Sequence, residues 1–259
     1  MRFLFLVLLA LSTQPAFAFG QTGHKMICDM AYQLSQPQTQ AHIDSVVKVS
    51  GLTGFAEGCV WPDTLRDDDS FKWSAPLHYV NFLPQQTAVS QADCAKHGCV
   101  LSAITDMQQR LAQDDNDWQA LLFLAHFIAD LHQPLHVSYA DDLGGNKTKV
   151  MFYQQATNLH SVWDSRILTT LGYNNNPNAQ QQLLRAIDSK LAYQWQQSTV
   201  LDWANESAAL TADIYRHYQP NMLLSDSYVQ QYQASLETRV QQAAVRLALV
   251  LDQAFHYRP

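Results

Sequence analysis

Residues 118–136, WQALLFLAHFIADLHQPLH, predict a buried helix around which the rest of the chain is organised. The segment is apolar on almost every side, which is typical of a helix in a protein core. An acidic run, residues 114–117, precedes it and offers an N-cap and first-turn acids. Pro134 predicts that the helix kinks or ends before His136.

Ionisable residues inside this apolar helix point to a metal site. His126 and Asp130 are spaced i and i+4, so they share one face of the helix. A buried charge needs a partner or a metal ion, and imidazole with carboxylate suits a divalent ion such as zinc. The pair His160 and Asp164 repeats the same spacing. His132 lies about 200° round the helix from Asp130, which favours a packing role over a ligand role.

The remainder of the chain predicts a single, mostly helical domain, all-α with at most a short β-hairpin. Residues 72–82 have an extended character around Pro76, and residues 148–153 resemble a short strand. Pro37 fits the first turn of a helix that stops near Gly51. Further helices are expected at residues 26–34, 101–111, 158–172, 181–197, 203–217 and 227–255.

The first 18 residues have the layout of a secretory signal peptide. Arg2 precedes nine apolar residues, 3–11, and a small-x-small site at Ala16-Phe17-Ala18 follows. Nine residues are too few to span a bilayer, and no later stretch is long enough. We therefore expect cleavage between Ala18 and Phe19, export of the chain and a single domain over residues 19–259.

The cysteines fit an exported protein. An even number, Cys28, Cys59, Cys94 and Cys99, survives cleavage and favours two disulfides, for which three connectivities exist. Cys94 and Cys99 bracket a short loop, so we expect them to pair and to leave Cys28 with Cys59. Zinc held by cysteine is the rival interpretation, but an oxidising compartment argues against it.

The charge balance is acidic. Of 16 Lys and Arg residues, Arg2 lies in the expected signal peptide, so 15 basic and 23 acidic residues remain, a net charge of −8. Such a balance argues against a nucleic-acid binder that relies on a basic face. The argument fails if bound metal ions supply the positive charge at the site of a phosphate.

Several motifs together resemble the zinc-dependent S1/P1 nuclease family of the phospholipase C/nuclease superfamily. The resemblance begins at Gly23-His24 and continues through Trp61-Pro62-Asp63 and His78-Tyr79-Val80-Asn81. It goes on through HFIADLHQPLH at residues 126–136, Gly144-Gly145-Asn146 and NLHSVWD at residues 158–164. The Gln-rich C-terminal third carries no matching motif.

The resemblance implies a site for three zinc ions. One ion would be bound by Asp63, His78, His126 and Asp130. A second would be bound by His24, by Asp130 as a bridge, and by the amino nitrogen and carbonyl oxygen of the mature N-terminal residue. That residue is usually tryptophan in the family and would be Phe19 here. The third ion would be bound by His136, His160 and Asp164.

The resemblance also implies roles in catalysis and substrate binding. Asp63 would orient or deprotonate the attacking water, and Arg66 would stabilise charge on the phosphate. Tyr79 would stack on a nucleobase, and Asn81 would hydrogen-bond to it, where some members carry aspartate. Leu143 and Asn146 would border the site.

We therefore expect an exported, monomeric zinc nuclease with no membrane segment. It would hydrolyse single-stranded RNA and DNA to 5′-nucleotides and would also act on 3′-nucleotides. The first alternative is a zinc phospholipase C, disfavoured by the short spacing from Phe19 to His24 and by Asp164 where the phospholipase pattern has glutamate. The second is a non-catalytic, zinc-stabilised binding protein.

Overall fold

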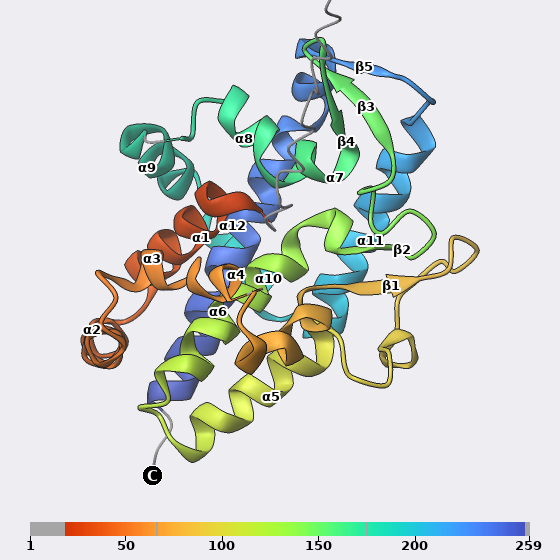
Figure 1. The fold of residues 1–259 in the computed structure, drawn as a ribbon. Helices are drawn as coiled ribbons and strands as arrows, with labels where there is room; N and C mark the ends of the chain where they lie inside the picture. The colour runs from red at the N-terminus through yellow and green to blue at the C-terminus, as the bar shows by residue number, and fades with distance from the viewer. Residues whose placement is uncertain (1–18, 66, 175, 257–259) are drawn as a thin grey trace, which may run out of the picture.

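The central helix, α6 (Trp118–His132), occupies the middle of the molecule in the computed structural model, which describes residues 19–65, 67–174 and 176–256 (Figure 1). Asp117 caps α6 by accepting a hydrogen bond from the backbone N–H of Ala120 at 3.0 Å. Every residue from Ala120 to His132 is buried, as the apolar surface of the helix predicts.

Longer helices surround α6 and form one core with it. Helix α5 (Val100–Gln113) packs along it, and α1 (Gly20–Leu34) and α2 (Pro37–Ser50) lie on one side. Helix α11 (Val200–His217) lies on the other side (Figure 1). The longest helix, α12 (Asp226–His256), contacts α1, α2 and α6. The chain is therefore a mostly helical single domain, which confirms the predicted fold class.

Shorter helical segments connect these elements, and several of them carry the site described below. They are α3 (Phe55–Gly58), α4 (Trp61–Thr64), η1 (Asp69–His78), η2 (Gln91–Asp93), η3 (Pro134–His136), α7 (Leu159–Ser161), η4 (Val162–Arg166), α8 (Ile167–Thr170), α9 (Pro177–Arg185) and α10 (Ser189–Gln196). Of these, η4 is a π-helix.

The strands are short and form two small sheets. β1 (Val80–Phe82) pairs in parallel with β2 (Val137–Tyr139), so Val80 lies opposite Val137. β3 (Lys149–Phe152) and β4 (Gln155–Asn158) form an antiparallel hairpin, and β5 (Leu223–Leu224) joins β3 in parallel. The sheet content thus adds the β1–β2 pair and β5 to the hairpin that the sequence predicts.

Two local predictions are wrong. The segment predicted to be extended, residues 72–82, is a strand only at β1. Residues 72–78 belong to the 3₁₀ helix η1, whose first turn is capped by the Asp68 side chain accepting from the Ser70 N–H. The helix predicted over residues 181–197 is divided into α9 and α10. Asp188 begins the second of these by accepting from the N–H groups of Lys190 and Leu191.

Two disulfides tie the chain together, with the pairing expected from the sequence. Cys28 of α1 is bonded to Cys59, and Cys94 to Cys99. Within the described residues, the helices are all too short or too polar to cross a membrane. The expected signal peptide, residues 1–18, lies outside the described part of the chain.

Candidate metal centre

Three groups of buried imidazoles and carboxylates could each hold a metal ion. In each group the possible ligand atoms lie within 4.8 Å of one another. The groups are His24 with His126 and Asp130, Asp63 with His78 and His126, and His136 with His160 and Asp164. The side chains that the sequence predicts as ligands are therefore brought together, although they come from seven helical segments, of which η3 is the turn after α6.

Asp130 lies where the first two groups meet. Its Oδ1 is 3.3 Å from Nε2 of His24, while its Oδ2 is 2.9 Å from Nδ1 of His78 and 3.2 Å from Nε2 of His126. Two nitrogen or oxygen ligands on one tetrahedral zinc, each about 2.0–2.1 Å from the ion, stand roughly 3.3 Å apart. The separations from Oδ1 to His24 and from Oδ2 to His126 match that value, so the two oxygens of Asp130 can serve different ions.

The third group is assembled after the Pro134 turn. His136 ends η3, His160 lies in α7, and Asp164 lies in the π-helix η4. Asp164 Oδ2 is 3.3 Å from Nε2 of His160, and its Oδ1 is 3.9 Å from Nε2 of His136. Single π-turns are rare and frequently occur at functional sites. Here the π-turn contributes a carboxylate to the group.

The backbone orients these imidazoles in a way that suits metal binding. Nδ1 lies 3.1 Å from Gly20 O in His24 and 2.7 Å from a carbonyl oxygen in His126, His136 and His160. The carbonyl partners of the last three are those of Cys59, His78 and Gly144. A histidine whose Nδ1–H donates to a carbonyl presents the lone pair of Nε2 to a metal.

Unsatisfied polar atoms support the same interpretation. Among the described side chains, Nε2 of His24 and of His136 is buried without a hydrogen-bond partner. An orphaned buried acceptor is costly, and a metal ion removes that cost. Nε2 of His78 is buried without a hydrogen-bond partner as well, while its Nδ1 faces Asp130 and His126. Nitrogen and oxygen donors without cysteine are the set used by catalytic zinc sites, so the residues fit zinc.

The buried charges of these groups shift the pKa values of their neighbours. Burial lowers the pKa of His126, but the carboxylates of Asp130 and Asp63 outweigh it and raise that pKa to about 9. Burial raises the pKa of Asp130, yet the neighbouring His126 brings it well below its usual range. Burial also lowers the pKa of His136 to about 3.

A cavity of about 320 Å³ opens beside the third group. All four residues predicted to contact the substrate, Tyr79, Asn81, Leu143 and Asn146, line it together with His78, His136 and His160. Tyr79 and Leu143 are exposed at 42% and 53%, so their apolar surfaces are available to a ligand. Three of the possible metal ligands, His78, His136 and His160, therefore form part of the wall of this pocket.

The turn that carries Leu143 requires its glycines. Leu143, Gly144 and Gly145 all have positive φ, at 56°, 62° and 84°. A Cβ on Gly144 would lie 2.4 Å from the carbonyl oxygen of Leu135. Gly144 is therefore required both by its backbone conformation and by close approach, and its own carbonyl holds His160.

The remaining predictions concern Phe19, Arg66 and His132. Phe19 is fully buried at the start of α1, where a Cβ on Gly23 would lie 2.8 Å from the Cβ of Phe19. Arg66 lies outside the described residues. His132 belongs to none of the three groups. Its Nδ1 lies 2.7 Å from Ile128 O and its Nε2 is 2.9 Å from a nitrogen of Arg246, which agrees with a packing role.

Gln133 is a site residue that the sequence motifs do not identify. Its side-chain N–H donates to Asp164 Oδ1 at 2.6 Å, and its side-chain oxygen accepts from the backbone N–H of Leu135 at 2.5 Å. It is fully buried. A polar residue at the end of an apolar helix, directly before a proline, is the one signal that could have marked it.

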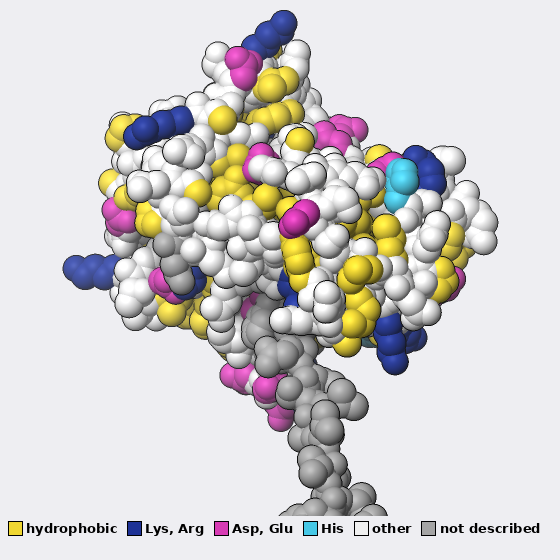
Figure 2. Space-filling view, turned by 90° about the horizontal axis from the view of Figure 1, so that it is seen from above, with side chains coloured by type: hydrophobic (Ala, Val, Ile, Leu, Met, Phe, Trp, Pro, Cys, Tyr) yellow, Lys and Arg dark blue, Asp and Glu magenta, His cyan; other side chains and the backbone are white. Residues whose placement is uncertain are grey.

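The surface agrees with the acidic composition. On the face shown in Figure 2, basic side chains stand apart from one another, with acidic and apolar side chains between them. Among the described residues on this face, no continuous basic patch is visible.

Comparisons with known proteins agree with the motifs and the geometry. The family model described as S1/P1 nuclease matches residues 19–256. Endonuclease 4 of Arabidopsis thaliana is 30% identical over 94% of this chain and 91% of its own length. Nuclease P1 of Penicillium citrinum is 35% identical over 57% of each chain, and nuclease S1 of Aspergillus oryzae is 30% identical over 60% of this chain and 56% of its own. The chain belongs to the S1/P1 nuclease family, and it is a nuclease with His and Asp clusters that can bind metal ions.

Proposed function

We propose that this nuclease hydrolyses single-stranded RNA and DNA to 5′-nucleotides, and also acts as a 3′-nucleotidase, at a site that holds three zinc ions. The observation that carries the proposal is the position of Asp130. Its two carboxylate oxygens face different imidazoles, 3.3 Å from His24 and 2.9 Å from His78. A third group, which includes His136, borders the same cavity.

The proposed ligand sets are those that the sequence motifs imply. The first zinc would be held by Asp63, His78, His126 and Asp130, the second by His24, Asp130 and the freed backbone of Phe19, and the third by His136, His160 and Asp164. Bound zinc ions would lower the pKa of water and neutralise phosphate charge. Asp63 Oδ1 lies 3.8 Å from Nε2 of His126, and its carboxylate would orient or deprotonate the attacking water.

The cavity would select the nucleotide. Tyr79 offers a ring for stacking on a base, which is favourable with any base. Asn81 can donate and accept hydrogen bonds, unlike an ionised aspartate, so base preference should differ from that of relatives with aspartate. Leu143 and Asn146 would close the other side of the pocket. Arg66 would stabilise charge on the phosphate, a role that stays a prediction.

We also propose that residues 1–18 are a signal peptide and that residues 19–259 form the exported, monomeric nuclease domain. Two observations support this. The family match begins at residue 19, and the two disulfides suit an oxidising compartment.

The test is a substrate panel with the zinc-replete chain that begins at Phe19. Single-stranded DNA, single-stranded RNA, duplex DNA, a 3′-nucleotide and phosphatidylcholine are offered separately, and bound zinc is counted by elemental analysis. We expect three zinc ions and hydrolysis of the single strands and the 3′-nucleotide. Asp63→Asn should lower kcat by about 10²–10⁴-fold, the usual contribution of a general base, while the surface variant Asp44→Asn serves as the matched control.

Other results of the substrate panel would each indicate a different function. Hydrolysis of phosphatidylcholine alone would indicate a phospholipase C, and zinc binding without any hydrolysis would indicate a binding protein. Equal rates on single-stranded and duplex DNA would remove the proposed strand preference.

A further inference from the structure

Three hydroxyl groups on α11 lie in one row. Ser207, Thr211 and Tyr215 follow one another at intervals of four residues, so their side chains project from the same face of the helix. Ser207 and Thr211 are fully buried. This row, called here the hydroxyl stripe, belongs to the C-terminal third of the chain, which carries no ligand motif.

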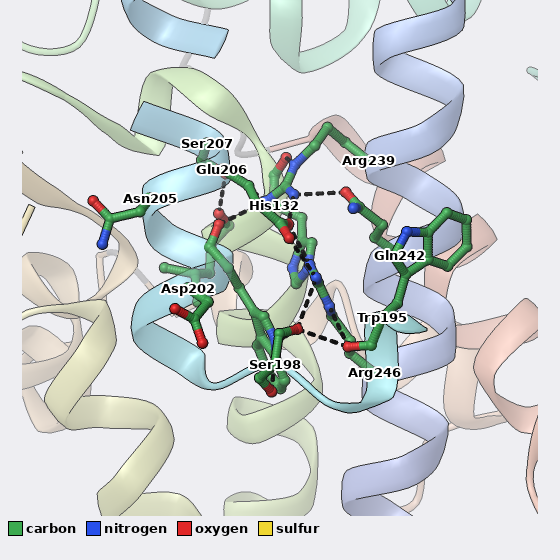
Figure 3. Close-up of polar contacts among 12 residues, drawn as sticks. His132, Trp195, Ser198, Asp202, Asn205, Glu206, Ser207, Arg239, Gln242 and Arg246 are labelled. Carbon is green, nitrogen blue, oxygen red and sulfur yellow. Dashed lines mark hydrogen bonds and ion pairs between the residues drawn. The ribbon is translucent and has the colours of Figure 1, made fainter. Parts of the chain in front are cut away.

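The first hydroxyl of the stripe contacts the end of α6. Ser207 Oγ donates to Leu131 O at 2.6 Å, one residue after Asp130. The last carbonyls of a helix have no partner within it, and Pro134 has no N–H to offer. Figure 3 shows Arg239 of α12 reaching the same region, where its side chain donates to Ser207 Oγ at 2.6 Å and to His132 O at 3.2 Å.

The second hydroxyl contacts the backbone on both sides of His136. Thr211 Oγ1 is within hydrogen-bonding distance of Pro134 O and of Val137 O, the latter at 3.0 Å. Its proton can satisfy either carbonyl. Val137 also begins β2, which pairs with β1 and so lies beside Asn81 of the substrate pocket. One hydroxyl therefore fixes the backbone on either side of a proposed zinc ligand.

The third hydroxyl reaches the glycine turn. Tyr215 donates to Asp142 Oδ2 at 2.6 Å, and Asp142 Oδ1 accepts from the Gly145 N–H at 2.9 Å. Asp142 also accepts from the hydroxyl of Thr148. The turn held in this way contains Gly144, whose carbonyl lies 2.7 Å from Nδ1 of His160.

We propose that the hydroxyl stripe of α11 positions the metal ligands by holding the chain segments that carry or orient them. Ser207 acts on Asp130, Thr211 on His136 and Tyr215 on His160. These are positioning residues, since each acts through the backbone or through Asp142. The inference rests on the proposed function for the identity of the ligands. Hydrogen-bonding partners of ligands commonly contribute about 10–100-fold to metal affinity, which is the effect expected here.

The experiment removes one hydroxyl without changing the shape of the side chain. Thr211→Val has nearly the same volume, and Thr211→Ser keeps the hydroxyl. Zinc affinity is measured by competition with a chromophoric chelator, and the visible spectrum of the cobalt-substituted protein reports ligand geometry. We expect Thr211→Val to weaken the binding of at least one ion by about 10–100-fold and to change the cobalt spectrum. Thr211→Ser should restore both.

A second pair of variants tests the stripe at its outer end, where folding is less at risk. Tyr215→Phe removes the bond to Asp142. Tyr173→Phe is its control, because Tyr173 makes a similar bond to Glu237 at 2.7 Å and neither residue belongs to a metal-binding group. Tyr215→Phe should lower zinc affinity and alter the cobalt spectrum, whereas Tyr173→Phe should alter only the unfolding midpoint measured in chelator.

The outcomes separate this inference from the proposed function. If the wild type binds zinc and cleaves single strands, while Thr211→Val and Tyr215→Phe bind zinc with unchanged affinity and spectrum, the stripe is only structural and the inference is overturned. If the wild type binds no zinc, the proposed function fails and the inference fails with it. Should Thr211→Val not fold, the Tyr215 pair alone decides.

Discussion

Gln133 contacts the candidate metal centre without being one of its expected ligands. His126 and Asp130 could be predicted as a ligand pair from their spacing alone, because the geometry of one helix places them together. Hydrogen bonds from nearby residues to ligands on other segments could not be predicted in this way. Gln133 contacts Asp164, 31 residues away, and no local pattern determines a contact between segments that meet only in the folded chain.

Replacing Gln133 with methionine should weaken the third metal group. The Leu135 N–H would lose its acceptor and Asp164 its donor, at a cost of about 1–3 kcal/mol for an unsatisfied buried group. We expect the affinity of one zinc ion to fall by about 10–100-fold, measured by chelator competition. Gln33→Met, which removes a surface bond to Asp29, is the control. An unchanged affinity would show that Asp164 needs no such support.

At the scale of elements, helix existence was easier to predict than helix boundaries. The start of α6 at Trp118 could be predicted, because the acidic run before it supplies the N-cap Asp117 and the residues from Ala120 onward are buried. The break between α9 and α10 depends on one capping side chain, Asp188, which competes with a continuous helical pattern. The π-turn η4 changes the hydrogen-bonding of a few residues around Asp164 and leaves no periodic signature.

The pairing of α11 with α12 should depend on pH through Glu206. Burial raises the pKa of this carboxyl, but hydrogen bonds and charges from Arg246 and Arg239 outweigh it and hold that pKa below its usual value of 4.5. The bonds from Arg246 are visible in Figure 3, at 2.6 and 2.7 Å. Because the folded pKa is depressed, the ionised carboxyl stabilises the fold above pH 4.5, and this stability is lost as the pH falls through the folded pKa.

Glu206→Gln tests this linkage. In chelator, the variant should be less stable than the wild type at pH 7, and the difference should shrink as the pH is lowered below about 4.5, when the wild-type carboxyl becomes protonated. Urea unfolding at several pH values gives the free energies. A difference that stays constant with pH would mean that Glu206 contributes through packing rather than charge.

At the scale of the whole molecule, metal binding should be coupled to folding. The three metal groups draw ligands from α1, α4, η1, α6, η3, α7 and η4, so an ion bound there binds only the folded chain. A ligand present at 100 times its dissociation constant adds about 2.7 kcal/mol of stability. Thermal unfolding should therefore move to lower temperature in chelator and return with added zinc. In Asp130→Asn, added zinc should raise the unfolding temperature less than in the wild type. An equal rise in this variant would exclude Asp130 as a bridge.

The start of the chain gives a further test of the proposed zinc ligands. Phe19 is buried beside Gly23, one turn before His24. A free amino group at Phe19 can donate a lone pair, whereas a peptide nitrogen cannot. A chain with two extra residues before Phe19 should therefore bind fewer zinc ions and cleave more slowly than the chain that begins at Phe19. Equal zinc content and equal turnover would contradict the proposed role of the terminus.

Asn81 and Leu143 line the proposed substrate pocket from two different kinds of backbone. Asn81 projects from a strand whose backbone is paired with β2, and Leu143 sits at the tip of a turn held by glycines. Neither side chain is a proposed ligand, and both line the 320 Å³ cavity. In the proposed function these two side chains help to select the nucleotide, so exchanging them, in paralogues or in the laboratory, would change selectivity while every proposed metal ligand is kept.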